Sequence, residues 1–215
     1  MYKMDNLFTS VVLDKKRRTL LTKLGFLTDY GFYLAGGTSL ALQIKHRTSL
    51  DFDFCTPKEF YPSKLKDEFN ERFKGVKEIH IAKDTLILEI EGVIVSFFAY
   101  PYKMLEPYVQ LGEVKLASLK DIAAMKIVAI AQRGRRRDFI DMYFLINIFG
   151  LKEIINSAKQ KYPKLNIYTV LQGLTYFKDA DEDSEDKRLR LFEEVNWRKV
   201  KNDIIKNVNQ VRPQL

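Results

Sequence analysis

Residues 34–54, LAGGTSLALQIKHRTSLDFDF, decide the fold that we expect. The apolar run at the start of this stretch is typical of a strand, and a pair of glycines ends it. Apolar residues then recur at helical spacing, and Thr38 or Ser39 is expected to cap that helix. After a polar turn, residues 50–54 alternate between apolar and acidic side chains, as a half-buried strand does. The stretch therefore predicts a strand–helix–strand unit.

Two carboxylates stand out in this stretch. Alternate residues of a strand point to one face, so Asp51 and Asp53 are expected to project together. Two carboxylates on one face repel each other unless a positive charge lies between them. Magnesium accepts oxygen ligands of this kind and completes its shell with substrate phosphates. The pair therefore predicts a site for one or two Mg²⁺ ions bound together with a nucleoside triphosphate.

The glycine pair predicts a place for the phosphates. Gly36 and Gly37 have no side chain, so phosphate oxygens can approach their backbone amides closely, and the following helix directs its amide-rich end at the anion. Each part alone is weak, because a Gly-Gly pair is usually a turn and an Asp-x-Asp pair is often the solvent face of an edge strand. Their order and spacing favour a triphosphate site.

The rest of the chain divides at about residue 117. We expect a mixed α/β core over residues 1–117 and an all-helical region over residues 118–215, hence an α+β fold. Ser118 followed by Asp121 resembles a capping box. The further elements that the pattern predicts are helices at 14–30, 62–73, 138–149, 151–161, 166–177 and 194–209, strands at 78–82 and 85–98 with a hairpin at Gly92, a loop marked by Pro101 and Pro107, and an acidic linker at 179–186.

Composition narrows the class of protein. Lys and Arg number 36 against 28 Asp and Glu, and the net charge of +8 favours anionic partners such as nucleotides or RNA. The single cysteine, Cys55, allows no internal disulfide, and we expect it to be a buried packing residue. No apolar run reaches the roughly 18 residues of a membrane helix, and the N-terminus does not resemble a signal peptide. We therefore expect a soluble cytoplasmic protein that does not contact membranes.

A second block, LASLKDIAAMKIVAIAQRGRRRDFIDMYFL at 116–145, joins the first in a resemblance. Together they resemble the AbiEii/AbiGii toxin family of abortive-infection and type IV toxin–antitoxin systems, within the polymerase-beta-like nucleotidyltransferase superfamily. The segments VSFFAYPYKMLEP at 95–107 and LTYFKDADEDSEDK at 174–187 are similar to the family as well. The resemblance spans about residues 18–205.

The resemblance implies a polymerase-beta-like core with a mixed sheet flanked by helices, and a helical region that completes the active-site cleft. It implies an NTP-dependent transferase with magnesium, whose acceptor hydroxyl belongs to RNA, tRNA above all, and which has a cognate antitoxin. The residue roles that it implies are nucleotide binding by Gly36, Gly37, Thr38, Ser39, Ser49, Lys126 and Arg133, metal binding by Asp51 and Asp53, and catalysis by Asp51, Asp53, Lys126, Asp138 and Asp141.

The residues of the second block leave alternatives open. Lys126 lies among apolar neighbours, so it either reaches a phosphate or extends from the edge of the core into solvent. On one continuous helix it shares a stripe with Arg133, Arg137 and Asp141; if Gly134 ends that helix, Asp138 becomes the N-cap of the next.

The Arg135-Arg136-Arg137 run either contacts RNA or is an exposed basic loop.

One departure from the family pattern bears on catalysis. Polymerase-beta-like enzymes have a third carboxylate on a later strand, and Ser96 stands where that acid is expected. Asp138 or Asp141 would have to compensate for the missing carboxylate. The alternative is a catalytically silent nucleotide- or RNA-binding regulator with the same fold.

Overall fold

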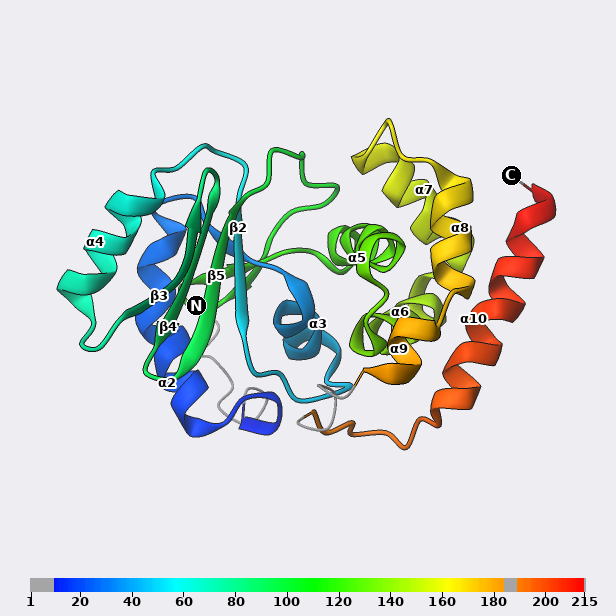
Figure 1. The fold of residues 1–215 in the computed structure, drawn as a ribbon, viewed down its shortest axis with the longest axis horizontal. Helices are drawn as coiled ribbons and strands as arrows, with labels where there is room; N and C mark the ends of the chain where they lie inside the picture. Colours follow the sequence, from blue (N-terminus) through cyan, green and yellow to red (C-terminus); the bar gives the residue numbers. More distant parts are fainter. Residues whose placement is uncertain (1–9, 184–188, 215) are drawn as a thin grey trace. The chain divides into compact units, whose positions relative to one another are not determined.

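The computed structural model describes residues 10–183 and 189–214, which form two compact units. The first unit comprises residues up to 103 together with 107–117, and the second comprises 104–106 and the residues from 118 onward. Figure 1 shows the first unit as a sheet with helices and the second as helices alone. The fold is thus α+β, as the sequence predicts.

A mixed seven-stranded sheet forms the centre of the first unit. Its strand order is β3-β4-β5-β2-β1-β7-β6. The β1–β7 and β2–β5 pairs are parallel, and the other neighbours are antiparallel. The strands are β1 (Tyr33–Leu34), β2 (Phe52–Thr56), β3 (Lys77–Ala82), β4 (Thr85–Ile90), β5 (Val93–Ala99), β6 (Val109–Leu111) and β7 (Val114–Leu116).

Helical segments belong to the first unit together with this sheet. They are α2 (Lys15–Lys23), η1 (Leu24–Thr28), α3 (Gly36–Ile44) and α4 (Pro62–Arg72). The ring of Phe69 on α4 lies 5.2 Å from that of Phe97 on β5, and Phe97 in turn stacks on Phe54 of β2 at 5.9 Å. These rings are fully buried, so burial of their apolar surface is a main source of stability in this unit.

Residues that alternate with these buried rings occupy the opposite face of the sheet. Asp53 pairs with Ser96, and Cys55 pairs with Phe98, across the parallel β2–β5 ladder. Because side chains of a strand alternate between faces, Asp53, Ser96, Cys55 and Phe98 share the face that α4 does not cover. Cys55 is 3% exposed, which confirms it as a buried residue.

The second unit is a set of helices around α5. Helix α5 contacts α6, α7 and α8, and α10 packs against these three as well (Figure 1). The elements are α5 (Leu119–Arg133), α6 (Arg136–Phe149), α7 (Leu151–Lys161), α8 (Ile167–Thr175), α9 (Lys178–Glu182), α10 (Trp197–Val211) and η3 (Arg212–Gln214). The capping box is confirmed, because the Ser118 hydroxyl accepts a hydrogen bond of 3.0 Å from the amide of Asp121.

The structure of the first unit differs from the predictions in three details. Helix α3 begins at Gly36, and its N-cap is Ala35 without a side-chain hydrogen bond, so neither Thr38 nor Ser39 caps it. The β6–β7 hairpin follows the proline-marked loop, in a stretch for which no strand was predicted. Strand β2 begins at Phe52, which places Asp51 immediately before the strand.

Three expectations about the second unit also need correction. Gly134, at a φ of +50°, ends α5, so the continuous helix is wrong. Asp138 lies in the first turn of α6, whose N-cap is Arg135, and Asp138 is therefore not the N-cap. Part of the expected acidic linker is helical, as α9, and its residues 184–186 lie outside the described part of the chain.

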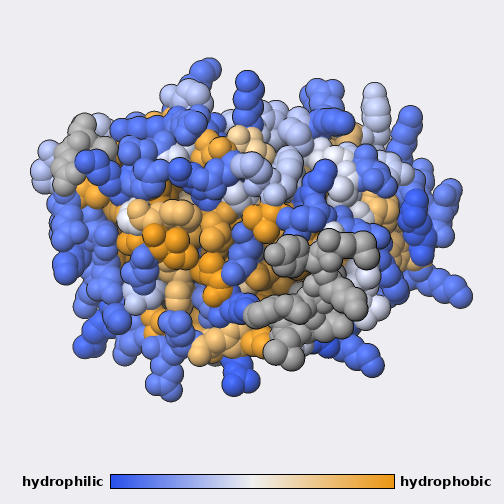
Figure 2. Space-filling view, turned by 180° about the vertical axis from the view of Figure 1, so that it is seen from behind, coloured by the Kyte–Doolittle hydropathy of each residue, from blue (hydrophilic) through white to orange (hydrophobic). Residues whose placement is uncertain are grey.

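One face of the molecule is seen in space-filling view. Figure 2 shows, from behind, polar side chains over most of the view and apolar ones gathered toward its middle. Within residues 10–183 and 189–214, no helix is both long and apolar enough to cross a bilayer.

Candidate active site

The first turn of α3 holds the carboxylate of Asp53 close to its backbone. Gly36 has a φ of +62°, and a Cβ atom at this position would lie 2.5 Å from Oδ2 of Asp53 and 3.2 Å from its Cβ. The amide of Ala35 also donates a hydrogen bond of 2.8 Å to the carbonyl of Asp53. Only glycine combines this backbone conformation with this close approach. The glycine turn and the metal-binding strand of the sequence analysis therefore meet.

Buried hydroxyl groups connect α3 to the segment before β2. The hydroxyls of Thr38 and Ser49 lie 2.6 Å apart, and Thr38 donates to the carbonyl of Asp51. Thr38, Ser39 and Ser49 are all at least nine-tenths buried. The hydrogen bonds of Thr38 hold the backbone of Asp51 against the start of α3. The Thr38 hydroxyl thus connects two segments and does not cap its own helix.

The amide-rich end of α3 suits an anion. A helix leaves its first amides without partners inside the helix, and α3 has no side-chain cap to satisfy them. These groups and the positive end of the helix dipole attract phosphate oxygens. Gly37 lies in this first turn beside Gly36. The arrangement can hold a phosphate chain next to Asp53.

The carboxylates of this unit fit a metal that shares its ligands with a substrate. Asp51 and Asp53 are both partly exposed, and the Asp51 carboxylate has no side-chain partner among residues 10–183 and 189–214. Ser96, paired with Asp53 across the ladder, occupies the neighbouring position. In the described residues, no group of three or more His, Cys, Asp or Glu side chains is placed to hold a metal. Two carboxylates alone suit Mg²⁺ that takes its remaining ligands from phosphates and water.

The second unit contains a buried ion cluster. The ammonium of Lys126 lies 2.6 Å from Oδ1 of Asp138 and 2.7 Å from Oδ2 of Asp141, and all three side chains are buried. Arg133, half exposed, reaches Asp138 at 3.2 Å. Burial raises the pKa of Asp138, but the charges of Lys126 and Arg133 outweigh it, so this pKa lies below its ordinary value. The cluster joins α5 to α6 across the break at Gly134.

This cluster changes the interpretation of Lys126. The sequence offered a lysine directed at a phosphate or one extending into solvent. Lys126 is buried, so it does not extend into solvent, and it has two carboxylate partners within its own unit. Its contact with a phosphate stays a prediction. Its charge is balanced there, since two carboxylates face one ammonium and one guanidinium.

The arginine run begins α6. Arg135 is its N-cap, and Arg136 and Arg137 are its first residues, all three half-buried. The amide of Arg136 donates to Oδ2 of Asp183 at 3.3 Å, and the guanidinium of Arg136 lies 4.9 Å from the ring centroid of Trp197. Part of this basic cluster therefore has partners within the unit.

A second buried ion pair was missed from the sequence. Lys161 contacts Asp121 at 2.7 Å, and both side chains are fully buried. Asp121 also accepts from the amides of Leu105 and Glu106 and from the Ser118 hydroxyl. The capping-box pattern marked Asp121, but nothing near Lys161 in the sequence indicates its partner 40 residues away. The pair holds residues 104–106 to the second unit.

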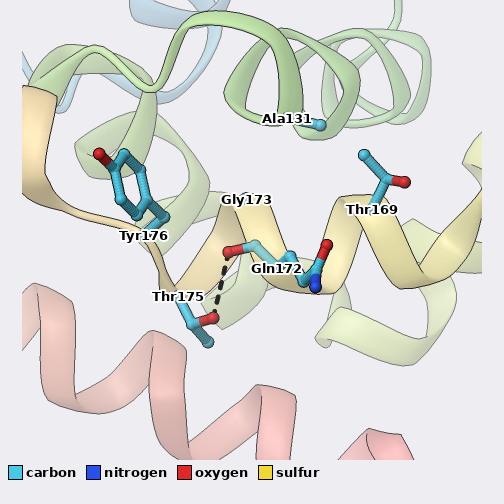
Figure 3. A pocket seen from close by; sticks show the side chains of 6 residues that line it. All are labelled: Ala131, Thr169, Gln172, Gly173, Thr175 and Tyr176. Atoms are coloured by element: carbon cyan, nitrogen blue, oxygen red, sulfur yellow. Dashed lines mark hydrogen bonds between the residues drawn. The ribbon is translucent and has the colours of Figure 1, made fainter.

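A shallow groove in the second unit lies away from the predicted residues. It has a volume of about 500 Å³ and is lined by Ala131, Thr169, Gln172, Gly173, Thr175 and Tyr176. Figure 3 shows Tyr176 and Thr169 at opposite ends, and Thr175 turned away toward α10. A Cβ atom on Gly173 would lie 2.7 Å from Cα of Ala131, so glycine permits the close packing of α8 on α5.

Comparison with known proteins places the chain among nucleotidyltransferases. Residues 26–210 match the family model described as nucleotidyl transferase AbiEii toxin, type IV toxin–antitoxin system. The uncharacterized protein aq_aa25 of Aquifex aeolicus (strain VF5) is 40% identical over 183 residues, which are 80% of this chain and 86% of that protein.

Two solved structures share the fold at low sequence identity. JHP933 from Helicobacter pylori matches with a TM-score of 0.56 and 14% identity over 99% of this chain and 95% of its own. MenT4, a nucleotidyltransferase toxin from Mycobacterium tuberculosis H37Rv, matches with a TM-score of 0.52 and 14% identity over 89% of this chain and 82% of its own.

Proposed function

This chain belongs to the nucleotidyl transferase AbiEii toxins of type IV toxin–antitoxin systems, and from that premise we propose how its residues transfer a nucleotide. As a member of this family it is a nucleotidyltransferase with a nucleoside triphosphate as substrate. We propose that the transfer depends on magnesium held by Asp51 and Asp53, and that the acceptor is a hydroxyl group of RNA, tRNA above all. The activity would make the chain the toxin-like component of a toxin–antitoxin or phage-defence system with a cognate antitoxin.

One observation carries the proposal. The carboxylate of Asp53 lies against Gly36 in the first turn of α3, where a side chain would displace it. A phosphate chain bound by the amides of Gly36 and Gly37 would thus lie beside the carboxylates, with Thr38, Ser39 and Ser49 beneath. Magnesium bound there would neutralise phosphate charge and polarise the α-phosphate.

The proposed transfer forms one bond to the α-phosphorus and breaks another. The acceptor oxygen forms a bond to the α-phosphorus of the triphosphate, and the bond from that phosphorus to the bridging oxygen breaks. Pyrophosphate leaves, and the hydroxyl proton passes to water or to a carboxylate of the pair. The protein mainly positions the groups and stabilises their charges, as in phosphoryl transfer generally.

The roles proposed for the second unit stay predictions. Arg133 lies half exposed at the end of α5 and pairs with Asp138, and we propose that its free surface contacts the nucleotide. The catalytic roles of Lys126, Asp138 and Asp141 rest on the family pattern, and the ion cluster gives them a structural role in addition. The basic run at Arg135–Arg137 supports an RNA acceptor by its charge.

A transfer assay tests the proposal. The full chain is incubated with each of the four radiolabelled triphosphates, magnesium and total RNA, and the labelled species are identified. We expect RNA to be labelled by the wild type and not by Asp51→Asn or Asp53→Asn, each of which removes one charge at nearly constant shape. Label on a protein or a small molecule would refute the RNA acceptor. Triphosphate binding without any transfer would instead support the silent regulator.

A further inference from the structure

Aromatic side chains continue the sheet face that carries Asp53. Cys55, two residues beyond Asp53 on β2, pairs with Phe98 on β5 and with Tyr33 on β1. All three therefore lie on the Asp53 face. Phe98 is two residues beyond Ser96, which at the rise of a strand is about 7 Å farther along the sheet. Along this face, an aromatic ring at Phe98 therefore follows the carboxylate of Asp53 at the next ladder position that faces the same way.

The segment that follows β5 adds further rings. The amide of Tyr100 donates to the carbonyl of Thr56 at the end of β2, and the rings of Tyr100 and Tyr102 lie 5.0 Å apart. Tyr108 packs over Tyr33 at 5.0 Å. We call Phe98, Tyr100, Tyr102 and Tyr108 the aromatic shelf.

The aromatic shelf is partly open to solvent above a closed core. Tyr33 and Cys55 beneath it are 1% and 3% exposed, whereas Tyr102 is 40% exposed, and the other three shelf rings are half-buried. Aromatic side chains gathered at a surface, rather than scattered singly, mark a candidate binding surface.

Two lysines lie beside rings of the aromatic shelf. Lys115 lies 6.0 Å from the ring centroid of Tyr108, and Lys103 follows Tyr102 directly. No acidic residue occurs in 98–105 or in 107–112. Rings flanked by lysines suit a ligand that combines flat bases with phosphates.

We propose that the aromatic shelf stacks unpaired nucleobases at the end of a single-stranded RNA acceptor, whose terminal hydroxyl then reaches the Asp51 and Asp53 site. The inference rests on the proposed function for the identity of the acceptor. Several rings in sequence suit several bases, whereas a donor triphosphate has only one base to stack. Stacking on aromatic side chains tolerates any base, so sequence preference is not needed.

An oligonucleotide with a fluorescent base tests the proposal without turnover. The probe is an eight-nucleotide single-stranded RNA with 2-aminopurine as its penultimate base, whose fluorescence falls on stacking. Dissociation constants are measured for the full-length wild type, Tyr102→Ala and Tyr102→Phe. Tyr102 is chosen because its ring is the most exposed of the shelf. Tyr61→Ala is the matched control, since Tyr61 is a 73% exposed tyrosine next to α4.

We expect Tyr102→Ala to weaken binding about tenfold and to abolish the quench, while Tyr102→Phe and Tyr61→Ala bind like the wild type. Unchanged affinity in Tyr102→Ala, or a wild type that does not bind the probe, would overturn the proposal. A raised KM for the triphosphate with unchanged probe affinity would assign the ring to the donor base and overturn it as well. Asp51→Asn separates the two ideas, because it should lose transfer and keep probe affinity.

Discussion

Gly36→Ala should displace the carboxylate of Asp53 and lower transfer activity by more than its loss of folding stability explains. A non-glycine residue at the observed φ of +62° costs about 1–2 kcal/mol. The added methyl group would also meet Asp53 at 2.5 Å from Oδ2, 3.2 Å from Cβ and 3.3 Å from Cγ. The carboxylate must therefore rotate away, and a displacement near 1 Å at a catalytic group can cost about a hundredfold in rate.

Gly75→Ala is the matched control for this change. Gly75 has a φ of +70°, and a Cβ atom there would meet nothing within 4 Å. Both variants should lose similar stability in urea unfolding, about 1–2 kcal/mol. Only Gly36→Ala should lose transfer activity, by about a hundredfold in kcat/KM. Equal activity in the two variants would refute the idea that Gly36 exists to admit the Asp53 carboxylate.

Other predictions concern the ion cluster and the missing acid. Lys126→Met should cost about 3–5 kcal/mol in urea unfolding, because Asp138 and Asp141 lose their buried partner; a loss below 1 kcal/mol would contradict the cluster's structural role. Because the pKa of Asp138 is lowered in the folded state, its contribution to stability is present above about pH 4 and is lost as the pH falls through the folded pKa. Melting temperatures across this range should fall less steeply in Asp138→Asn, and parallel curves would refute this. Ser96→Asp should lower stability without metal and gain magnesium affinity without nucleotide in calorimetry, since it adds a third acid beside Asp53; unchanged magnesium affinity would argue against that placement.

The sequence predicted most of the local structure around the candidate site. Helical spacing and the glycine pair located α3 and β2, since those signals arise within a few residues. The cap at Thr38 was wrong because its hydroxyl serves contacts more than ten positions away, to Ser49 and Asp51. The Ser39 hydroxyl instead accepts a hydrogen bond from the side-chain amide of Gln43 within the helix. Local rules describe what a hydroxyl can do for its own helix and cannot weigh a more distant partner.

Long-range pairing limited the prediction in the second unit. The family pattern identified Lys126, Asp138 and Asp141 as site residues. It did not indicate that they neutralise one another in a buried cluster. Pairing at long range also explains why the contact between Lys161 and Asp121 was missed. These two residues are 40 positions apart and meet only because α5 packs on α7. The β6–β7 hairpin was missed because its strands have three residues each, too few for a periodic signal.

Triphosphate binding measured with and without magnesium tests the central claim most directly. Isothermal titration of the wild type should show tight binding only with both present, because the negative charge of the triphosphate alone would face the two carboxylates of Asp51 and Asp53. In the Asp51→Asn, Asp53→Asn double variant the coupling should disappear, so that magnesium no longer changes the affinity. Equal triphosphate affinity of the wild type with and without magnesium, or undiminished coupling in the double variant, would contradict the account.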